Sequence, residues 1–327
     1  MFIEVHVLIV EKNTDKRIFT NGGPMIDVCL LGCGGMMPLP NRGLSALLCR
    51  QNGKMILLDC GEGTQVSIKL AGWGFKSIEA LCVTHYHADH IVGLPGFLLT
   101  LGNSGRVEPL TIFGPPYLSE IVNSLRIIAP ALPFEIILVE LSEQWSTRNH
   151  IGDFIVKSLP VDHNIPCLAY SIEVNRAGKF DVQKAISHNI PMKLWNPLQK
   201  GEVVEYEGKT FEPNMVLGNQ RKGLKITYST DTRPTEALID FARESDLYIC
   251  EGMYGDDALL PKAIERKHMT FSEAAALANK SDSKELWLTH YSPSLEYPNQ
   301  YINNAKNIFT NTILGEDIMK KVIKFEN

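Results

Sequence analysis

The 327-residue sequence predicts a layered α/β fold, and three observations support this. Short apolar runs of strand length alternate along the chain with segments in which apolar residues recur at helical spacing. No internal repeat or low-complexity segment interrupts the alternation. Polar motifs containing His and Asp come directly after several apolar runs, which is where open α/β sheets place their ligands. With 44% hydrophobic residues, the chain can bury a substantial core.

The elements can be assigned in chain order. Eight short apolar runs are predicted to be buried strands: residues 26–31, 55–59, 80–84, 110–113, 134–139, 226–228, 247–250 and 286–289. Five segments with helical periodicity are predicted to be helices: residues 64–71, 91–101, 117–128, 234–242 and 270–279.

One long polar stretch, from about residue 175 to residue 225, interrupts this order. It is punctuated by Gly and Pro, has only weak short periodic segments, and is too long for an ordinary connection. It carries nine Lys and Arg against five Asp and Glu, a net charge of +4, which leaves −9 for the rest of a chain whose total is −5. We expect an inserted flexible arm, with a solvated connector as the alternative.

Composition excludes several classes of protein. The seven cysteines are scattered and never spaced as Cys-x-x-Cys, so we expect buried free thiols rather than disulfides or a thiolate zinc site. No secretory signal is recognisable, and no segment approaches the roughly 20 apolar residues that a membrane span needs. The expectation is a cytoplasmic protein without membrane contact. The net charge of −5 argues mildly against a general nucleic-acid binder, so any RNA contact requires local positive charge.

The densest group of chemically active residues is the sequence Thr-His-Tyr-His-Ala-Asp-His at residues 84–90. It holds three of the nine histidines directly after a predicted strand. Neutral imidazoles beside a carboxylate are what borderline divalent metals bind, whereas the alternative is a polar turn with incidental histidines. In an extended chain His85 and His87 project to one side, while Asp89 and His90 begin the next helix and can face a second ion.

This motif, followed by Gly93-Leu94-Pro95-Gly96, resembles the metallo-β-lactamase superfamily, and specifically its ribonuclease Z branch. Further motifs match in order over about residues 25–300: residues 57–65, Gly114-Pro115-Pro116, Asp162-His163, residues 229–234, Glu251, His268-Met269-Thr270 and residues 289–292. The histidine motif alone specifies only a superfamily that hosts many reactions. The pair Glu251 and His268, together with the basic arm, points to ribonuclease Z.

The resemblance implies a four-layer αβ/βα sandwich. The catalytic domain would span residues 25–327, with the arm inserted at about 175–225, and residues 1–24 would be an N-terminal extension. Two interpretations of the extension stay open. Apolar and polar residues alternate in residues 2–10, which predicts an extra edge strand, or the segment is an addition that the fold does not need.

The resemblance also implies a site for two zinc ions. One ion would be held by His85, His87 and His163, the other by Asp89, His90 and His290, and Asp231 would bridge them. Each distant histidine alone could equally be a core residue, but together they complete a coordination count with room for water. Asp59 resembles a carboxylate that orients ligand histidines, and the alternative is an N-cap of the following helix.

The implied reaction is hydrolysis of the phosphodiester at the 3′ end of precursor tRNA, which leaves a 3′-hydroxyl on the tRNA and a 5′-phosphate on the trailer. Two zinc ions about 3.5 to 4 Å apart suit such an in-line displacement. His268, held by Glu251, would protonate the leaving oxygen, although alone it could be an exposed loop histidine. Asp89 would orient the attacking water. The arm would grip the tRNA body, and the protein would be a homodimer.

Three departures from the family pattern bear on the phosphate grip and the arm. Thr230 stands where the family usually has Gly. The last motif of the family commonly carries Arg near the position of Leu295, and the arm tip reads Pro191-Met192-Lys193 without a Pro-Gly pair. An alternative function on the same site is a metallo-phosphodiesterase acting on small or cyclic nucleotides. A metal-dependent RNA-binding protein without catalysis is disfavoured, because the catalytic set Asp89, Glu251 and His268 is complete.

Overall fold

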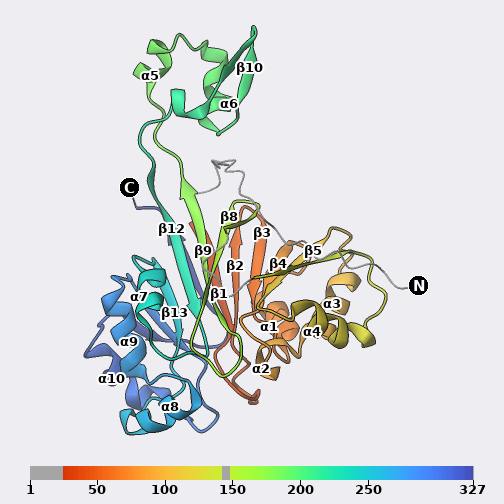
Figure 1. Cartoon of the computed structure of the whole chain (residues 1–327), viewed down its shortest axis with the longest axis vertical. Helices are drawn as coiled ribbons and strands as arrows, with labels where there is room; N and C mark the ends of the chain where they lie inside the picture. Colours follow the sequence, from red (N-terminus) through yellow and green to blue (C-terminus); the bar gives the residue numbers. More distant parts are fainter. Residues whose placement is uncertain (1–24, 142–147, 327) are drawn as a thin grey trace.

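The computed structural model describes residues 25–141 and 148–326, and in this part of the chain two seven-stranded sheets pack face to face. The question of an edge strand at residues 2–10 lies outside the described residues. Figure 1 shows the two sheets side by side at the centre, helices on both outer faces, and an arm projecting from one end. The predicted four layers, αβ/βα, are therefore present.

The first sheet contains mostly N-terminal strands. Its order is β16 (Met319–Lys324), β1 (Met25–Gly32), β2 (Ala46–Gln51), β3 (Lys54–Leu58), β4 (Ile78–Cys82), β5 (Leu110–Gly114) and β6 (Ile136–Glu140). Its outer face is covered by α1 (Thr64–Ala71), α3 (Leu94–Asn103) and α4 (Leu118–Leu125), which continues into the 3-10 turn η1 (Arg126–Ile128).

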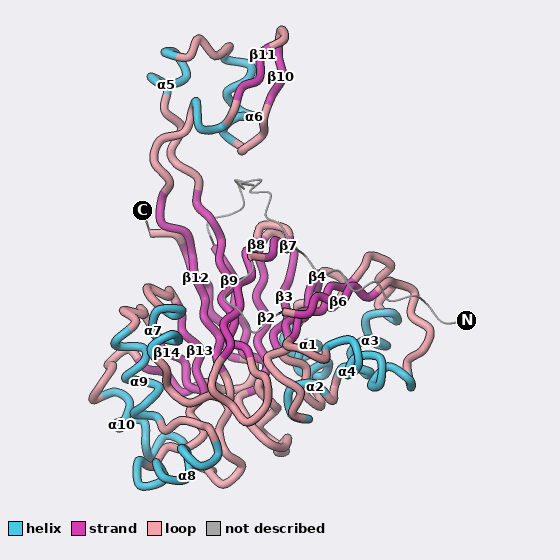
Figure 2. Tube along the Cα trace, viewed as in Figure 1, coloured by secondary structure: helices cyan, strands magenta, loops and turns pink. Residues whose placement is uncertain are grey.

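The second sheet contains the C-terminal strands. Its order is β15 (Thr312–Leu314), β14 (Leu286–Thr289), β13 (Leu247–Glu251), β12 (Arg221–Ser229), β9 (Leu168–Arg176), β8 (Phe154–Pro160) and β7 (Asn149–Ile151). Four helices lie on its side of the molecule: α7 (Glu236–Ala242), α8 (Leu260–Arg266), α9 (Phe271–Lys280) and α10 (Ile302–Lys306). Figure 2 shows the strands of both sheets running toward one loop-rich edge, opposite the arm.

Strand β1 shows why the predicted strands read as continuous apolar runs. Val28 and Leu30 lie in the core between the sheets, whereas Cys29 and Leu31 lie in the core beneath the helices. Successive side chains of a strand point to opposite faces, so the part of a strand that is covered on both faces forms a continuous apolar run, as residues 28–31 do. All eight predicted strands are present, with ends shifted by a few residues.

The helix predicted at residues 91–101 is wrong in its boundaries, because two helices occupy this region, α2 (Ala88–Ile91) and α3. Gly93 separates them. A Cβ at Gly93 would lie 2.0 Å from the carbonyl oxygen of Gly61. The N–H of Gly93 donates to the carbonyl of Cys60 at 3.0 Å. Contact with a distant loop therefore determines the break.

The arm consists of a stem and a folded head. Strands β9 and β12 pair as far as Arg176 and Arg221, and residues 177–220 form the arm head beyond them. The head contains α5 (Val182–Ser187), η2 (Met192–Leu194), α6 (Trp195–Gln199), the hairpin β10 (Val204–Tyr206) and β11 (Lys209–Phe211), and η3 (Pro213–Met215). Apolar residues from these elements, including Leu198 and Phe211, form a separate small core. The weak periodicity of this stretch in the sequence did not indicate these elements.

The positive charge of the arm is concentrated in its stem. The arm head carries five Lys and no Arg against five Asp and Glu, so it is neutral by formal charge. The stem supplies Arg176, Arg221, Lys222 and Lys225. Lys222 pairs with Glu244 at 2.8 Å, and the guanidinium of Arg221 donates to the carbonyl of Ala177 at 2.8 Å. Much of the excess positive charge therefore lies at the root of the arm, where Lys222 forms an ion pair and Arg221 a hydrogen bond.

All seven cysteines are buried and free, as predicted. Within residues 25–141 and 148–326, every helix is too short or too polar to cross a bilayer.

Candidate metal centre

The seven residues predicted as metal ligands come from four places in the chain, and the structure brings all of them together. His85 and His87 follow β4, and α2 carries Asp89 and His90. The remaining three residues each follow a strand of the second sheet: His163 after β8, Asp231 after β12 and His290 after β14. These strand ends meet at one edge of the sandwich, so residues about 200 positions apart become neighbours.

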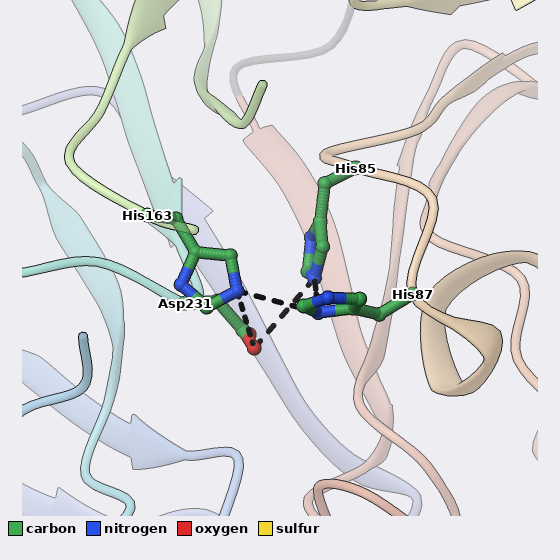
Figure 3. Close-up of side chains that lie close together, drawn as sticks. All are labelled: His85, His87, His163 and Asp231. Atoms are coloured by element: carbon green, nitrogen blue, oxygen red, sulfur yellow. Dashed lines mark hydrogen bonds and ion pairs between the residues drawn. The ribbon is translucent and has the colours of Figure 1, made fainter. Parts of the chain in front are cut away.

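The first group consists of three histidines and one oxygen of Asp231, drawn in Figure 3 with their side chains pointing toward a common centre. His87 Nδ1 lies 3.1 Å from His85 Nε2 and 3.3 Å from His163 Nε2. Asp231 Oδ2 lies 3.6 Å from His85 Nε2 and 3.8 Å from His163 Nε2.

The second group uses the other oxygen of the same carboxylate. Asp231 Oδ1 lies 3.1 Å from His290 Nε2 and 3.3 Å from His90 Nε2. Asp89 Oδ2 lies 3.4 Å from His290 Nε2 and 3.5 Å from His90 Nε2. Asp231 therefore stands between the groups and directs one oxygen at each.

These spacings fit a metal site. Donor atoms about 2.1 Å from a tetrahedrally bound ion lie about 3.4 Å from one another, which is the range found in both groups. Asp231 Oδ1 is buried without a hydrogen-bond partner within the described residues, which is costly unless a cation satisfies it. Burial lowers the pKa of His85 well below its usual value, which favours the neutral ligand form.

Asp59 anchors one of these histidines from behind. Its Oδ2 lies 2.9 Å from His90 Nδ1, and its Oδ1 accepts from the N–H of Thr84 at 2.8 Å. The hydroxyl of Tyr228 also donates to it at 3.3 Å. Because Asp59 engages Nδ1, His90 Nε2 is free to face Asp89 and Asp231 in the second group. The N-cap alternative is wrong, because Gly63 occupies the N-cap of α1 and no side chain caps it.

His268 lies beside the two groups, and with Asp231 and His290 it forms a third set of residues that could hold a metal ion. Its Nδ1 is 3.2 Å from Glu251 Oε2 and 3.9 Å from Asp231 Oδ2. Burial lowers the pKa of His268, but the charge and hydrogen bond of Glu251 outweigh burial and raise it to about 9. Glu251 itself is fully buried and accepts from the N–H groups of Thr232 and Met269. One carboxylate thus holds both the loop of Asp231 and the loop of His268.

The backbone of His268 is held as well. The guanidinium of Arg233 donates to the carbonyl of His268 and forms a two-pronged ion pair with Glu273 in the first turn of α9. On the other side, Lys267 pairs with Asp162, the residue before His163. The loop of His268 is therefore fastened to two of the loops that carry candidate ligands.

Asp89 and His290 are fixed by the loop after β1. The N–H of Met36 donates to Asp89 Oδ2 at 2.6 Å. His290 has a φ of 58°, a left-handed conformation that few non-glycine residues adopt. A Cβ at Gly35 would lie 2.6 Å from the His290 ring, so only glycine leaves space for the imidazole.

Two of the departures from the family pattern have identifiable contacts. The hydroxyl of Thr230 is buried and donates to the hydroxyl of Thr84 at 3.4 Å, so it joins the hydrogen bonds around Asp59. Leu295 is largely buried, and its carbonyl accepts from the guanidinium of Arg42 at 2.9 Å. Arg42 therefore fixes the loop at Leu295.

A hollow of about 590 Å³ opens over the two groups, and its walls include three residues that no sequence motif indicated. Beside His87, Asp89, His163, His268 and His290, its walls include Lys262 and Arg266 of α8 and Tyr254 after β13. These three residues carry no motif, and only the packing of α8 against the end of β13 places them here. They give the hollow positive charge and an aromatic wall.

Known proteins resemble this chain in sequence over most of its length and in fold. Ribonuclease Z of Clostridium acetobutylicum is 54% identical over 308 residues, covering 93% of this chain and 100% of that protein. The chain belongs to the ribonuclease Z family. The crystal structure of human tRNase Z, short form (ELAC1), covers 92% of this chain and 100% of its own, with 25% identity and a TM-score of 0.66.

Two further similarities are partial or more distant. The metallo-β-lactamase fold protein YhfI from Bacillus subtilis has 18% identity and a TM-score of 0.63, covers 91% of this chain and 99% of its own, and shares the fold. A family profile described as "Anti-Pycsar protein Apyc1" matches residues 26–126, which include the motif at residues 84–90 but end before His163. The predictions of the metallo-β-lactamase fold and of an enzyme of the ribonuclease Z type are confirmed.

Proposed function

We propose that this member of the ribonuclease Z family is a zinc-dependent endoribonuclease that hydrolyses the phosphodiester at the 3′ end of precursor tRNA. The products would be a 3′-hydroxyl on the tRNA and a 5′-phosphate on the trailer. The single observation that carries the proposal is the position of Asp231. Its Oδ2 lies within 4 Å of two histidines of the first group, and its Oδ1 lies within 4 Å of two histidines of the second group. A bridging carboxylate of this kind favours a site for two ions.

The residues would hold the ions as the geometry groups them. His85, His87 and His163 would hold one zinc, Asp89, His90 and His290 the other, and Asp231 both. The ions would supply Lewis acidity and lower the pKa of a water molecule. Histidine nitrogens and carboxylate oxygens are the donor set that zinc accepts in catalytic sites.

The remaining steps fall to side chains of this chain. Glu251 orients His268 through Nδ1, which leaves Nε2 to carry the proton that the departing 3′-oxygen of the tRNA needs. Asp89, fixed by the N–H of Met36, would orient the attacking water. Lys262 and Arg266 line the same hollow and would attract the phosphates on either side of the cleaved bond.

The arm favours a large substrate over a small one. The folded head lies far beyond the sheets on a two-stranded stem, where a mononucleotide at the metal centre could not reach it. Binding contacts so distant from the chemistry are useful only for a substrate as extended as tRNA. The alternative, a phosphodiesterase restricted to small or cyclic nucleotides, gives the head no task.

The proposal includes a cytoplasmic homodimer. Ile127 and Ile128 at the end of α4 are each 74% exposed, and η1 packs beside α3, where Leu99 is also exposed. Contiguous exposed apolar residues of this kind favour association with another surface. Light scattering of the purified protein at micromolar concentration would test this part, and a monomer would refute it.

One experiment tests the central claim. A precursor tRNA labelled at its 5′ end is incubated with the protein, with and without a chelator, and the new 3′ end is mapped. We expect one cut at the 3′ end of the tRNA body, a free 3′-hydroxyl, and loss of the cut with the chelator. Hydrolysis of a small diester without any cleavage of the precursor would instead support the alternative.

A further inference from the structure

A second hollow adjoins the one over the candidate metal groups and has no task in the proposed mechanism. It measures about 250 Å³ and shares three wall residues with the larger hollow: Met253, Tyr254 and Ser292. Its other walls come from the turn after β13 and from residues 294–301. Because the two hollows share these residues, they lie next to each other, and the smaller hollow is within reach of a nucleotide adjacent to the metal groups.

Three tyrosines line this second hollow, and they differ in freedom. Tyr254 is buried, with Lys262 Nζ 5.4 Å from its ring centroid. Tyr301 packs on the backbone of Gly255, where an added Cβ would lie 2.7 Å from Tyr301 Cβ. Tyr297 is 64% exposed as a residue, and its side chain makes no hydrogen bond, ring stacking or cation contact with any residue that the structure describes. One aromatic face is thus open at the rim of the hollow.

The charges of the hollow select the type of occupant. Asp256 and Glu296 line it, so a phosphate would be repelled there. The cations Lys262 and Arg266 instead line the neighbouring hollow, over the metal groups. A nucleotide placed with its phosphate beside these cations would direct its base toward the tyrosines. Ser294, Glu296 and Gln300 offer hydrogen-bond donors and acceptors to the edge of a base.

A third hollow also adjoins the larger one, with which it shares His163 and Asn164. It measures about 430 Å³ and is lined by Pro115, Pro116, Asn164 and other residues, none of which is Phe, Tyr or Trp. Single-stranded nucleic acid binds to proteins by stacking its bases on aromatic rings, which any base can do. Among the described residues that line the two smaller hollows, Tyr side chains are therefore found in the one that contains Tyr297 and not in the other.

We propose that the hollow between Tyr254 and Tyr297 is a nucleobase subsite for a nucleotide next to the scissile phosphate, with Tyr297 as the stacking face. The inference rests on the proposed function and adds a specific base contact to it. Its consequence is that the enzyme depends on a base at one position beside the cut, largely regardless of which base it is.

The test combines changes in the enzyme with changes in the substrate. Precursors with an abasic residue immediately before or immediately after the cleavage site are compared with the intact precursor, using wild-type enzyme and Tyr297→Ala. In the wild type, removing the base at one of the two positions should lower kcat/KM about tenfold, the scale of one base–aromatic stack. Tyr297→Ala should lower kcat/KM for the intact precursor by a similar factor and abolish the abasic penalty. Tyr297→Phe should retain both.

The matched control is Tyr117→Ala, since Tyr117 is also 64% exposed but lines none of the three hollows. It should leave the abasic penalty intact. Equal abasic penalties in wild type and Tyr297→Ala, or no penalty at either position in the wild type, would overturn the subsite.

A second substrate pair separates this inference from the proposed function. Thymidine 5′-(p-nitrophenyl phosphate) carries a base, and methyl p-nitrophenyl phosphate does not. In the wild type the ratio of their kcat/KM values should favour the nucleotide, and Tyr297→Ala should reduce that ratio. If the precursor is not cleaved, the tRNA function fails, but this ratio still decides whether Tyr297 binds a base.

Discussion

The metal centre draws its candidate ligands from positions between His85 and His290, whereas the arm head is one continuous stretch, residues 177–220. The ligands are held by side chains and backbone groups from both sheets, such as Asp59, Glu251 and Met36. The arm head has its own small core, and within the part of the chain that the structure describes it is joined to the body through the two stem strands. Chemistry that needs sub-ångström placement thus depends on the whole sandwich, while the head is a separately folded attachment.

The largest effect is expected at the residue that both metal groups share. Asp231→Asn should reduce bound metal below the roughly two ions per chain expected for a dinuclear site, and should abolish hydrolysis of precursor and small diester alike. Elemental analysis and both assays measure this. Asp246→Asn is the matched control, because Asp246 is a buried carboxylate at the opposite end of the same sheet. Full metal content in Asp231→Asn would refute the shared-ligand arrangement.

The next effect separates proton transfer from metal binding. His268→Ala should lower kcat about 10²- to 10⁴-fold, because it removes the proton donor to the leaving oxygen, while metal content stays unchanged. His150→Ala, at an exposed position of β7, should change neither value. Loss of metal in His268→Ala would make His268 a ligand instead.

The third prediction removes the arm head. Arg176 and Arg221 are cross-strand partners, so a two-residue Asn-Gly turn can join them in place of residues 177–220. The kcat/KM for precursor tRNA should fall about tenfold or more, equivalent to about 1.4 kcal/mol of lost binding, whereas small-diester hydrolysis stays unchanged. An equal loss on both substrates would contradict the separation of head and metal centre.

A milder change tests whether the head folds on its own core. Leu198 is fully buried there, and Leu198→Ala should destabilise the head by about 2 to 5 kcal/mol without altering metal content. Hydrogen exchange should accelerate at residues 177–220 alone, and precursor cleavage should fall less than after deletion. Val203→Ala, at a head position that is 62% exposed, serves as the control. Faster exchange around the metal centre would show that the two regions are coupled.

The smallest effect is expected from removing residues 1–24, which lie outside the described residues. A chain starting at Met25 retains β1 and every candidate ligand and catalytic residue, so we propose that it folds and cleaves precursor tRNA with little loss. Activity and thermal unfolding of the truncated chain provide the measurement. An insoluble or inactive product would show that the segment is an integral strand of the fold.

Local sequence patterns predicted one cluster of candidate metal ligands and most of the strands that lead to the site, although β8, which precedes His163, was not predicted. His85, His87, Asp89 and His90 are close in the chain, and local spacing is enough to indicate their chemistry. His163, Asp231 and His290 could be assigned only by resemblance, because nothing local shows that the ends of β8, β12 and β14 meet. Strands with both faces covered were predictable because burial on both sides produces a continuous apolar run, as in residues 28–31 of β1.

Other features were decided only by the tertiary structure. The break between α2 and α3 at Gly93 arises from contact with the loop at Gly61, and the assembly of a separate core in the arm head depends on residues that periodicity did not connect. The net charge of +4 over residues 175–225 concealed a neutral head and a basic stem, because composition does not record where the chain turns. Likewise, Tyr254 and Lys262 have no motif and line the hollow over the metal groups through packing, since contacts between distant segments have no signature in local sequence.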